Sequence, residues 1–365
     1  MFWSTSVVAV FLCSVICAGI LIPQILLIAF RKSLFDEIDE RKIHHSAVPR
    51  LGGMAFAPVV LFSTVLLLGV TLAIGNNSFL NELLKELKSV AFLICSVIML
   101  YLVGLADDLI GVKYRAKFVV QIACAIMFIA SNTYMRDFCG VFGCNELYTW
   151  FGVLFTMLLV VFIINAINLI DGVDGLASGL SGVAMLFYGT IFYMLGEYMY
   201  SIIAFATLGG VIQFFYYNVF GKAEKQQKIF MGDTGALTIG ILLCFLALKL
   251  SSHDTEETHN ANPLIMSFAP LLIPCFDVIR VFFGRIRRNK NPFLPDKTHI
   301  HHKLMAIGLS PQVTMITIIV SSIIFTAGNI ILSPYLNVNI LIILDIVVWI
   351  LFNIWLTHKI DAKTK

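Results

Sequence analysis

The sequence has too little charge to cover the surface of a soluble protein of its size. Only 13% of its 365 residues are charged and 59% are hydrophobic, whereas soluble domains carry roughly 25% charged residues. A large soluble helical core is therefore excluded. The formal net charge is only +3, and the composition predicts no nucleic-acid partner.

Basic residues are missing from the start of the chain. The first is Arg31, and the apolar run before it is long, so we expect a retained membrane span rather than a cleaved signal peptide. Six of the eight cysteines lie in predicted spans, where Cys behaves as a small apolar residue. Cys139 and Cys144 share one predicted external loop and could form a disulfide in an oxidising compartment.

What the chain does contain is a series of apolar runs of roughly 17–25 residues, the length of a helix that crosses about 30 Å of hydrocarbon. Backbone groups in lipid must be satisfied within the segment, so these runs should be helices. The sequence predicts an all-α polytopic membrane protein, a single domain over 1–365, with about eleven transmembrane helices. The predicted spans are 3–30, 51–75, 88–106, 117–135, 150–169, 176–195, 200–219, 234–250, 263–283, 312–332 and 339–357.

Basic residues are distributed unevenly between alternate connections. One set of connections holds 20 of the 25 Lys and Arg residues, and the opposite set holds three. The basic set is predicted to be cytoplasmic, which places the N-terminus outside and the C-terminus inside. Its members are 31–50, 107–117, 170–175, 220–233, 284–311 and the tail from 358.

Two adjacent carboxylates, Asp107 and Asp108, follow an apolar run at a predicted membrane boundary. They repel each other and resist desolvation, so they make sense where a divalent cation or basic residues offset their charge. Basic residues, including Lys117, follow within one short loop. The alternative is a solvated loop end.

The segment Asn165–Leu176 places Asn165, Asn168, Asp171 and Asp174 at every third position. On a continuous helix these four side chains could not share one narrow stripe. The glycines after each Asp suggest that the helix opens beyond Asn168, so that the acids converge from irregular backbone lining a polar cavity. The alternative, a plain hydrophilic turn, does not explain the Asn pair.

A further acid, Asp233, lies between glycines where the next apolar run begins. It could serve as a metal ligand, as an N-cap, or as both. Asp and Asn oxygens without Cys favour Mg²⁺ or Mn²⁺ over zinc.

Basic and histidine residues cluster in the two largest cytoplasmic connections. Arg41–His45, followed by Pro49–Gly53, could hold phosphate through Gly backbone and a helix N-terminus, or could act only as a topological anchor. The His motif, defined as His299–His302, has no thiolate in its loop, so we expect phosphate binding or proton transfer rather than zinc. Asp277 and Arg280, one turn apart, are predicted to form a structural ion pair.

Taken in order, the motifs Arg-Lys…Pro-Arg-Leu-Gly-Gly, Asp-Asp, Asn-Ala-Ile-Asn-Leu-Ile-Asp-Gly-Val-Asp-Gly, Met-Gly-Asp and His-Ile-His-His resemble those of the polyprenyl-phosphate N-acetylhexosamine-1-phosphate transferases. The resemblance covers roughly residues 35–310. It implies a bacterial inner-membrane enzyme with its site on the cytoplasmic face. The implied substrates are undecaprenyl phosphate and a UDP-sugar, most closely UDP-N-acetylglucosamine. It also implies Mg²⁺ and leaves room for a homodimer.

The resemblance also implies roles for individual residues. Asn168 and Asp233 would bind the metal, Asp107 and Asp108 would stand near the lipid phosphate, and Asp171 and Asp174 would line the nucleotide and metal cavity. The implied catalytic set is Asp107, Asp108, Asp171, Asp174 and His299, and the implied substrate-binding set is Lys42, Lys117, Asn165, His301 and His302.

Two other functions remain open at this point. A proton-coupled transporter would also hold acids, but near the membrane midplane on broken helices. A magnesium-dependent membrane prenyltransferase would gather acids spaced three or four residues apart in two Asp-rich motifs, without the adjacent pair or the His motif. An uptake assay distinguishes the transporter from the transferase, and release of UMP rather than diphosphate distinguishes the prenyltransferase.

Overall fold

The computed structural model describes residues 2–34, 48–253, 258, 261–289, 291 and 298–364. Within these residues, ten helical segments are long and apolar enough to cross a membrane, so the predicted all-α polytopic fold is confirmed. They are α1 (Phe2–Arg31), η1 (Gly52–Ala55) with α2 (Phe56–Ala73), α4 (Leu87–Ile110), α6 (Thr149–Ile170), α7 (Leu176–Met194), α8 (Tyr198–Phe220), α9 (Gly232–Leu250), α10 (Pro263–Phe268) with η3 (Ala269–Leu271) and α11 (Leu272–Arg287), α13 (Pro311–Leu332) and α14 (Val338–Thr364).

The remaining elements are shorter. They are α3 (Ser78–Lys85), α5 (Tyr114–Ala130), η2 (Ala223–Lys225), α12 (Ile300–Ala306) and the antiparallel hairpin of β1 (Asp137–Val141) and β2 (Cys144–Glu146). The hairpin was not predicted, and it carries Cys139 and Cys144 as free thiols. Helix α5 corresponds to the predicted span 117–135. Its 17 residues reach roughly 26 Å at 1.5 Å per residue, so its place as an eleventh span stays a prediction.

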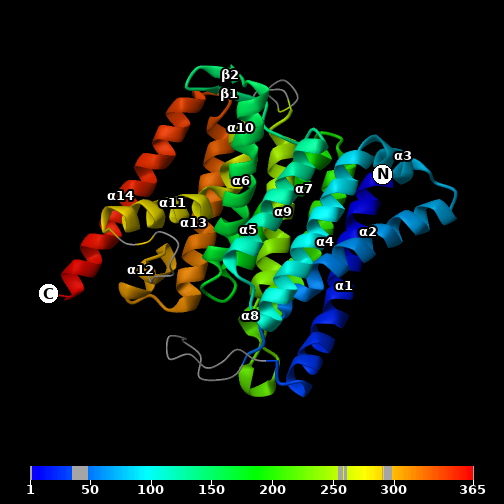
Figure 1. The fold of residues 1–365 in the computed structure, drawn as a ribbon, viewed down its shortest axis with the longest axis horizontal. Helices are drawn as coiled ribbons and strands as arrows, with labels where there is room; N and C mark the ends of the chain where they lie inside the picture. Colours follow the sequence, from blue (N-terminus) through cyan, green and yellow to red (C-terminus); the bar gives the residue numbers. More distant parts are fainter. Residues whose placement is uncertain are drawn as a thin grey trace.

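One predicted span is not a straight helix. The segment 263–283 breaks at η3, which contains Pro270, and α11 then lies across the direction of the other long helices (Figure 1). Proline lacks the N–H that a continuous helix needs and clashes with the preceding turn. The predicted span therefore corresponds to one apolar segment, Pro263–Arg287, that changes direction at η3, and this turn carries α11 towards α12.

Helix α9 is the centre of the bundle. Of its apolar stretch, 89% is buried inside the protein, against 28% for α13 and for α14. Small residues allow this burial: a Cβ added to Gly104 of α4 would lie 2.5 Å from the Thr234 Cα, and one added to Gly240 would lie 3.0 Å from the Ile164 Cα of α6. The first turn of α9 is thereby packed closely against α4, and the middle of α9 against α6.

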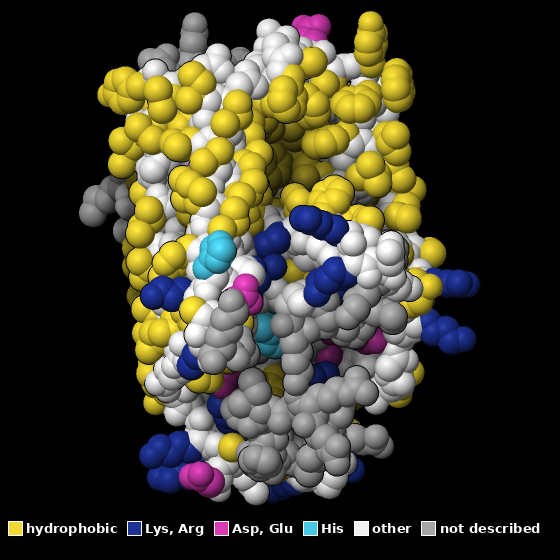
Figure 2. Space-filling view, turned by 90° about the vertical axis from the view of Figure 1, so that its left-hand side faces the viewer, with side chains coloured by type: hydrophobic (Ala, Val, Ile, Leu, Met, Phe, Trp, Pro, Cys, Tyr) yellow, Lys and Arg dark blue, Asp and Glu magenta, His cyan; other side chains and the backbone are white. Residues whose placement is uncertain are grey.

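The two sets of connections lie at opposite ends of the bundle. The N-terminus, α3 and the β hairpin are at the upper end in Figure 1, and α12 and the end of α1 are towards the lower end. Figure 2 shows hydrophobic side chains covering the upper part of one face, with most Lys, Arg, Asp, Glu and His side chains below. Which end faces the cytoplasm stays a prediction.

Candidate active site

Three helix ends bring two carboxylates and one ammonium group together. Asp107 lies in the last turn of α4, Lys117 in the first turn of α5 and Asp233 in the first turn of α9. Lys117 Nζ is 2.7 Å from Asp107 Oδ2 and 2.5 Å from Asp233 Oδ2. These side chains are only 16–25% exposed, so the single positive charge of the ammonium group reduces the repulsion between the two carboxylates.

Asn168 joins this cluster from the last turn of α6, where its Nδ2 lies 3.4 Å from Asp233 Oδ2. The Lys117 ammonium stands where a cation would bridge the carboxylates. Among the described residues, no three His, Cys, Asp or Glu side chains form a metal-binding group. Mg²⁺ commonly takes one or two carboxylates and completes its shell with water and substrate phosphates. The donor set of two carboxylates and one amide oxygen therefore fits this ion.

Asp108 differs from its neighbour. Its Oδ1 accepts the Asp233 N–H at 2.8 Å, and its Oδ2 accepts the Thr234 N–H at 2.9 Å and the Thr234 hydroxyl at 2.5 Å. A carboxylate there satisfies the unpaired amides of α9 and complements its dipole. The N-cap residue of α9 is Met231, so the alternative that Asp233 is the N-cap was wrong. Asp108 holds the α9 terminus from another helix.

The opening of the chain after α6 is confirmed. The helix ends at Ile170, and Gly175 adopts φ +77°, a left-handed conformation that favours glycine, before α7 begins. Burial raises the pKa of the Asp171 carboxyl to about 7, with the nearby Asp174 carboxylate adding to the effect. Asp174 accepts a hydrogen bond from Lys228 Nζ at 2.6 Å, so the second acid is paired with a cation.

The His motif packs against this same loop. The His301 ring is buried, and a Cβ added to Gly172 would lie 2.3 Å from its Nε2. The rings of His299 and His301 are stacked with centroids 5.7 Å apart, and His302 lies at 4.2 Å from His301. Burial, together with the other two histidines, lowers the pKa of His301 to about 3. His301 is therefore a neutral ring at physiological pH.

Comparison with known proteins agrees with this arrangement. Residues 90–251 match the family described as Glycosyl transferase family 4. Over 365 residues the chain is 30% identical to the probable undecaprenyl-phosphate N-acetylglucosaminyl 1-phosphate transferase of Bacillus subtilis, covering 98% of this chain and 94% of that protein. The chain belongs to glycosyl transferase family 4.

Enterobacterial relatives are less similar to this chain, both in sequence identity and in the share of the chain that they cover. The undecaprenyl-phosphate alpha-N-acetylglucosaminyl 1-phosphate transferases of Salmonella typhi and Escherichia coli K12 are 27% and 25% identical over 293 residues, covering 80% of this chain and 74% of each relative. The matched family region contains the Asp107–Lys117–Asp233 cluster and the Asp171 loop. The His motif lies beyond it, so the family match and the packing against Gly172 support the site independently.

The glycine pair Gly52–Gly53, which the sequence suggested as a phosphate-binding element of this family 4 enzyme, packs against the start of α9 instead. The Gly52 N–H donates to the Phe230 carbonyl at 2.9 Å, and the Gly53 N–H donates to the Met231 carbonyl at 2.8 Å. A Cβ added to Gly53 would lie 2.1 Å from the Gly235 Cα. The prediction that this Gly pair binds phosphate was therefore wrong, because its amides are already bonded and its glycines permit close packing.

Asn165 lies outside the charged cluster. Its Nδ2 donates to Gln121 Oε1 at 2.8 Å and to the Val161 carbonyl at 2.7 Å. This amide links α6 to α5, and its predicted contact with substrate gains no support from the geometry. Lys42, together with the rest of Arg41–His45, lies outside the described residues.

The sequence did not single out two residues that lie beside the candidate site. Lys228 was counted only as a topological charge, although it pairs with Asp174. Asn218 of α8 accepts the Gly175 N–H at 2.6 Å and donates to the Ile229 carbonyl at 2.8 Å, which ties the Asp171 loop to the segment that carries Lys228. A buried Asn at the end of an apolar run was the available signal.

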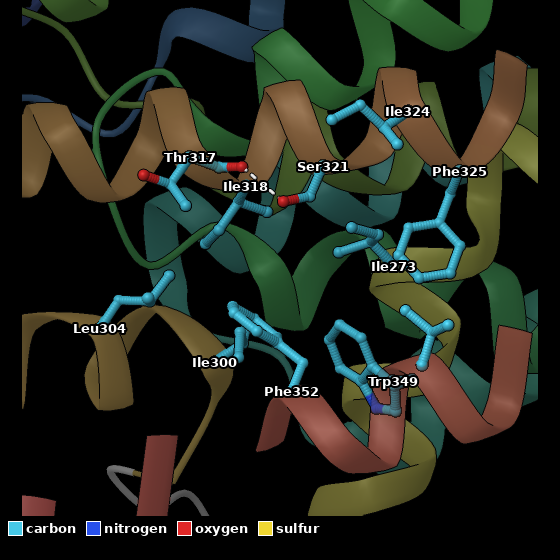
Figure 3. A pocket seen from close by; sticks show the side chains of 11 residues that line it. Ile273, Ile300, Leu304, Thr317, Ile318, Ser321, Ile324, Phe325, Trp349 and Phe352 are labelled. Carbon is cyan, nitrogen blue, oxygen red and sulfur yellow. Dashed lines mark hydrogen bonds between the residues drawn. The ribbon is translucent and has the colours of Figure 1, made fainter. Parts of the chain in front are cut away.

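A cavity of about 180 Å³ lies behind the His motif (Figure 3). Its walls come from α11, α12, α13 and α14, and they include Ile273, Ile300, Leu304, Ile318, Trp349 and Phe352. None of its lining residues carries a charge, so it is not the place for a nucleotide or a metal ion. The charged chemistry lies on the other side of the His motif, at the Asp171 loop.

Proposed function

We propose that this enzyme transfers N-acetylglucosamine-1-phosphate from its UDP-sugar to undecaprenyl phosphate, releasing UMP and leaving a lipid diphosphate sugar. The relatives named above support the donor sugar and the lipid acceptor. The observation that carries the proposal is the Lys117 ammonium group between Asp107 and Asp233, beside Asn168. This arrangement provides a partly buried position for a cation. It supports the proposal because phosphoryl transfer depends on neutralising the charge of the phosphate groups.

We propose Mg²⁺ as the cation of this site, held by Asp233 and Asn168 with Asp107 beside them. When bound, the ion neutralises the charge of the diphosphate and of the departing UMP. Lys117 offsets part of the negative charge of Asp107 and Asp233, and Asp108 fixes the α9 backbone that carries Asp233. Each of these residues therefore sets the charge or the position of the ligand carboxylates.

The bond changes follow from this placement. An oxygen of the lipid phosphate attacks the phosphorus that bears the sugar, and the bond from that phosphorus to the UMP oxygen breaks. A phosphate monoester has a second pKa near 6, so the acceptor is already largely ionised at neutral pH. Positioning and charge neutralisation then matter more than a strong general base.

The same proposal includes a location in the bacterial cytoplasmic membrane, with the site on the inner face, the N-terminus outside and α5 as an eleventh span. The uneven distribution of Lys and Arg supports this orientation. A homodimer is also compatible with it.

Accessibility of Cys144 tests the orientation. This exposed thiol of the β hairpin should react with a membrane-impermeant maleimide in intact spheroplasts after mild reduction. The label should be lost when Cys144 and Cys139, the other free thiol of the hairpin, are both changed to Ser. In that double-Ser background, Glu224→Cys at the opposite end should react only after permeabilisation. The reverse pattern would contradict the proposed orientation.

Substitution of Gly172 tests the contact between the Asp171 loop and the His motif. In Gly172→Ala the new methyl group would collide with the His301 ring, so we expect UMP release to fall at least about tenfold, consistent with small misplacements costing up to about 10²-fold. Gly182→Ala on α7 is the matched control, because its Cβ would meet its nearest atoms at an ordinary 3.8 Å. Equal turnover in the two variants would show that the contact is not needed.

A further inference from the structure

Asp277 of α11 is a carboxylate with no exposed surface. Its Oδ1 accepts hydrogen bonds from Arg280 Nη2 at 2.7 Å and from the Ile300 N–H at 2.9 Å, and its Oδ2 lies 2.8 Å from His299 Nδ1. The predicted ion pair with Arg280 is confirmed. The structure adds that the same carboxylate binds the beginning of the His motif, 22 residues further along the chain.

Helix α11 forms hydrogen bonds with three consecutive residues around the start of the His motif, Thr298 to Ile300. Arg280 donates to the Thr298 carbonyl at 2.6 Å, and Asp277 binds His299 and the Ile300 N–H. The Ile300 side chain extends in the other direction, into the apolar cavity behind the His motif (Figure 3). The start of α12 is thus fixed by hydrogen bonds on one side and by apolar packing on the other.

These contacts determine which nitrogen of His299 carries hydrogen. The ion pair with Arg280 favours the ionised form of Asp277, and an ionised carboxylate can only accept hydrogen bonds. His299 Nδ1 must therefore donate, which leaves Nε2 at the opposite edge of the ring for other partners. That ring is stacked on His301, which in turn packs against Gly172 of the Asp171 loop.

We propose that Asp277 is a positioning residue for the transfer reaction: it fixes His299 in the Nδ1–H form and leaves Nε2 unprotonated on the side of the donor substrate, where it can accept a hydrogen bond or a proton. The proposal rests on the proposed function for the identity of the ligand. Asp277 itself is buried and touches no substrate. Its effect on turnover passes through His299.

The substitution Asp277→Asn separates this role from the ion pair. The amide oxygen can still accept from Arg280 and from the Ile300 N–H, so the turn into α12 keeps its bonds. The amide nitrogen then faces His299 Nδ1, and two donors cannot pair. His299 must move its hydrogen to Nε2 or leave its position. The variant therefore changes the proton on the ring while altering the packing very little.

The experiment is a double-mutant cycle on the full chain in detergent or liposomes, with UDP-N-acetylglucosamine, undecaprenyl phosphate and Mg²⁺. We expect Asp277→Asn to lower kcat by about 10²-fold or more, within the range that a wrong His tautomer can cost, with KM for the UDP-sugar changed less than about threefold. In the His299→Gln background, adding Asp277→Asn should change kcat less than about twofold, because residues acting through one another are not additive.

The matched control is Asp345→Asn on α14. Asp345 is another buried carboxylate, 7% exposed, but its hydrogen bond is to Asn329 rather than to a histidine. Its variant should keep kcat within about twofold of the parent, as expected for a site without shared partners. Additive losses in the cycle, or near-parental turnover of Asp277→Asn, would overturn the role of Asp277.

A second measurement does not depend on turnover. Nitrogen-15 NMR of His-labelled protein, with His299→Gln to assign the signal, should show the neutral His299 ring protonated at Nδ1 and bare at Nε2. Hydrogen on Nε2 would overturn the proposal even if Asp277→Asn failed to fold. Absence of UMP release by the parent enzyme, together with the expected ring signal, would instead reject the proposed function and leave the Asp277–His299 pairing intact.

Discussion

Replacing Asp233 with Ala should abolish transfer without unfolding the protein. The Asp233 side chain faces Lys117 and Asn168, whereas the hydrogen bond that anchors α9 uses the Asp233 backbone N–H and the Asp108 carboxylate. The anchor therefore survives the loss of the side chain. We expect UMP release to fall by about 10³-fold or more, the upper range for losing one electrostatic group of a transferase site, with an unfolding midpoint within a few degrees of the parent.

The control for this prediction is Glu224→Ala, which removes an exposed acid of η2 near the same end of the bundle. It should leave turnover unchanged. Asp108→Ala should differ from both variants, because the unpaired N–H groups at the start of α9 would cost about 1–3 kcal/mol each in addition to the loss of activity. Near-parental turnover of Asp233→Ala would reject the metal assignment.

Removal of divalent metal should stop the reaction completely, and added Mg²⁺ should restore it. The two carboxylates and the amide of the cluster offer only oxygen donors, which suit Mg²⁺ and Mn²⁺ better than zinc. The assay is UMP release after EDTA treatment and again after addition of each ion. Full activity in EDTA would contradict a metal-dependent transferase.

Lys117→Met offers a readout for the same metal that does not require catalysis. In the parent, the ammonium group offsets part of the negative charge of Asp107 and Asp233 in the absence of metal. Without it, the two carboxylates repel each other, so the metal-free variant should unfold at a lower temperature. Mg²⁺ should then raise its unfolding midpoint more than it raises that of the parent, since a ligand that binds only the folded state stabilises it by mass action. Equal shifts in the two proteins would place the ion elsewhere.

Local patterns in the chain were sufficient for several features of the site. The two glycines after Asp171 and Asp174 indicated that α6 would open beyond Asn168, and the helix does end at Ile170. The spacing of Asp277 and Arg280 indicated an ion pair one turn apart, which is present at 2.7 Å. Both features depend on residues close in sequence, whose relative position is fixed by the geometry of one helix or one turn.

Contacts between distant segments could not be predicted in this way. Asp107 and Asp108 are adjacent in the sequence, yet one pairs with Lys117 and the other binds the start of α9. Asn165 resembled a site residue by its spacing from Asn168, but its amide bonds Gln121 of α5. Which neighbour a helix end meets depends on how the helices pack, and periodicity along the chain does not contain that information.

The sequence by itself determined that this protein is a membrane-embedded helical bundle with its acidic and histidine motifs gathered at one end. The shortage of charge and the length of the apolar runs require such a fold, because lipid forces each segment to satisfy its own backbone. Only the tertiary structure decided which partner each charged side chain contacts. Close packing around α9 and the break before α11 bring Lys117 between two acids and Asp277 beneath His299, and buried charges must take the partners that packing supplies.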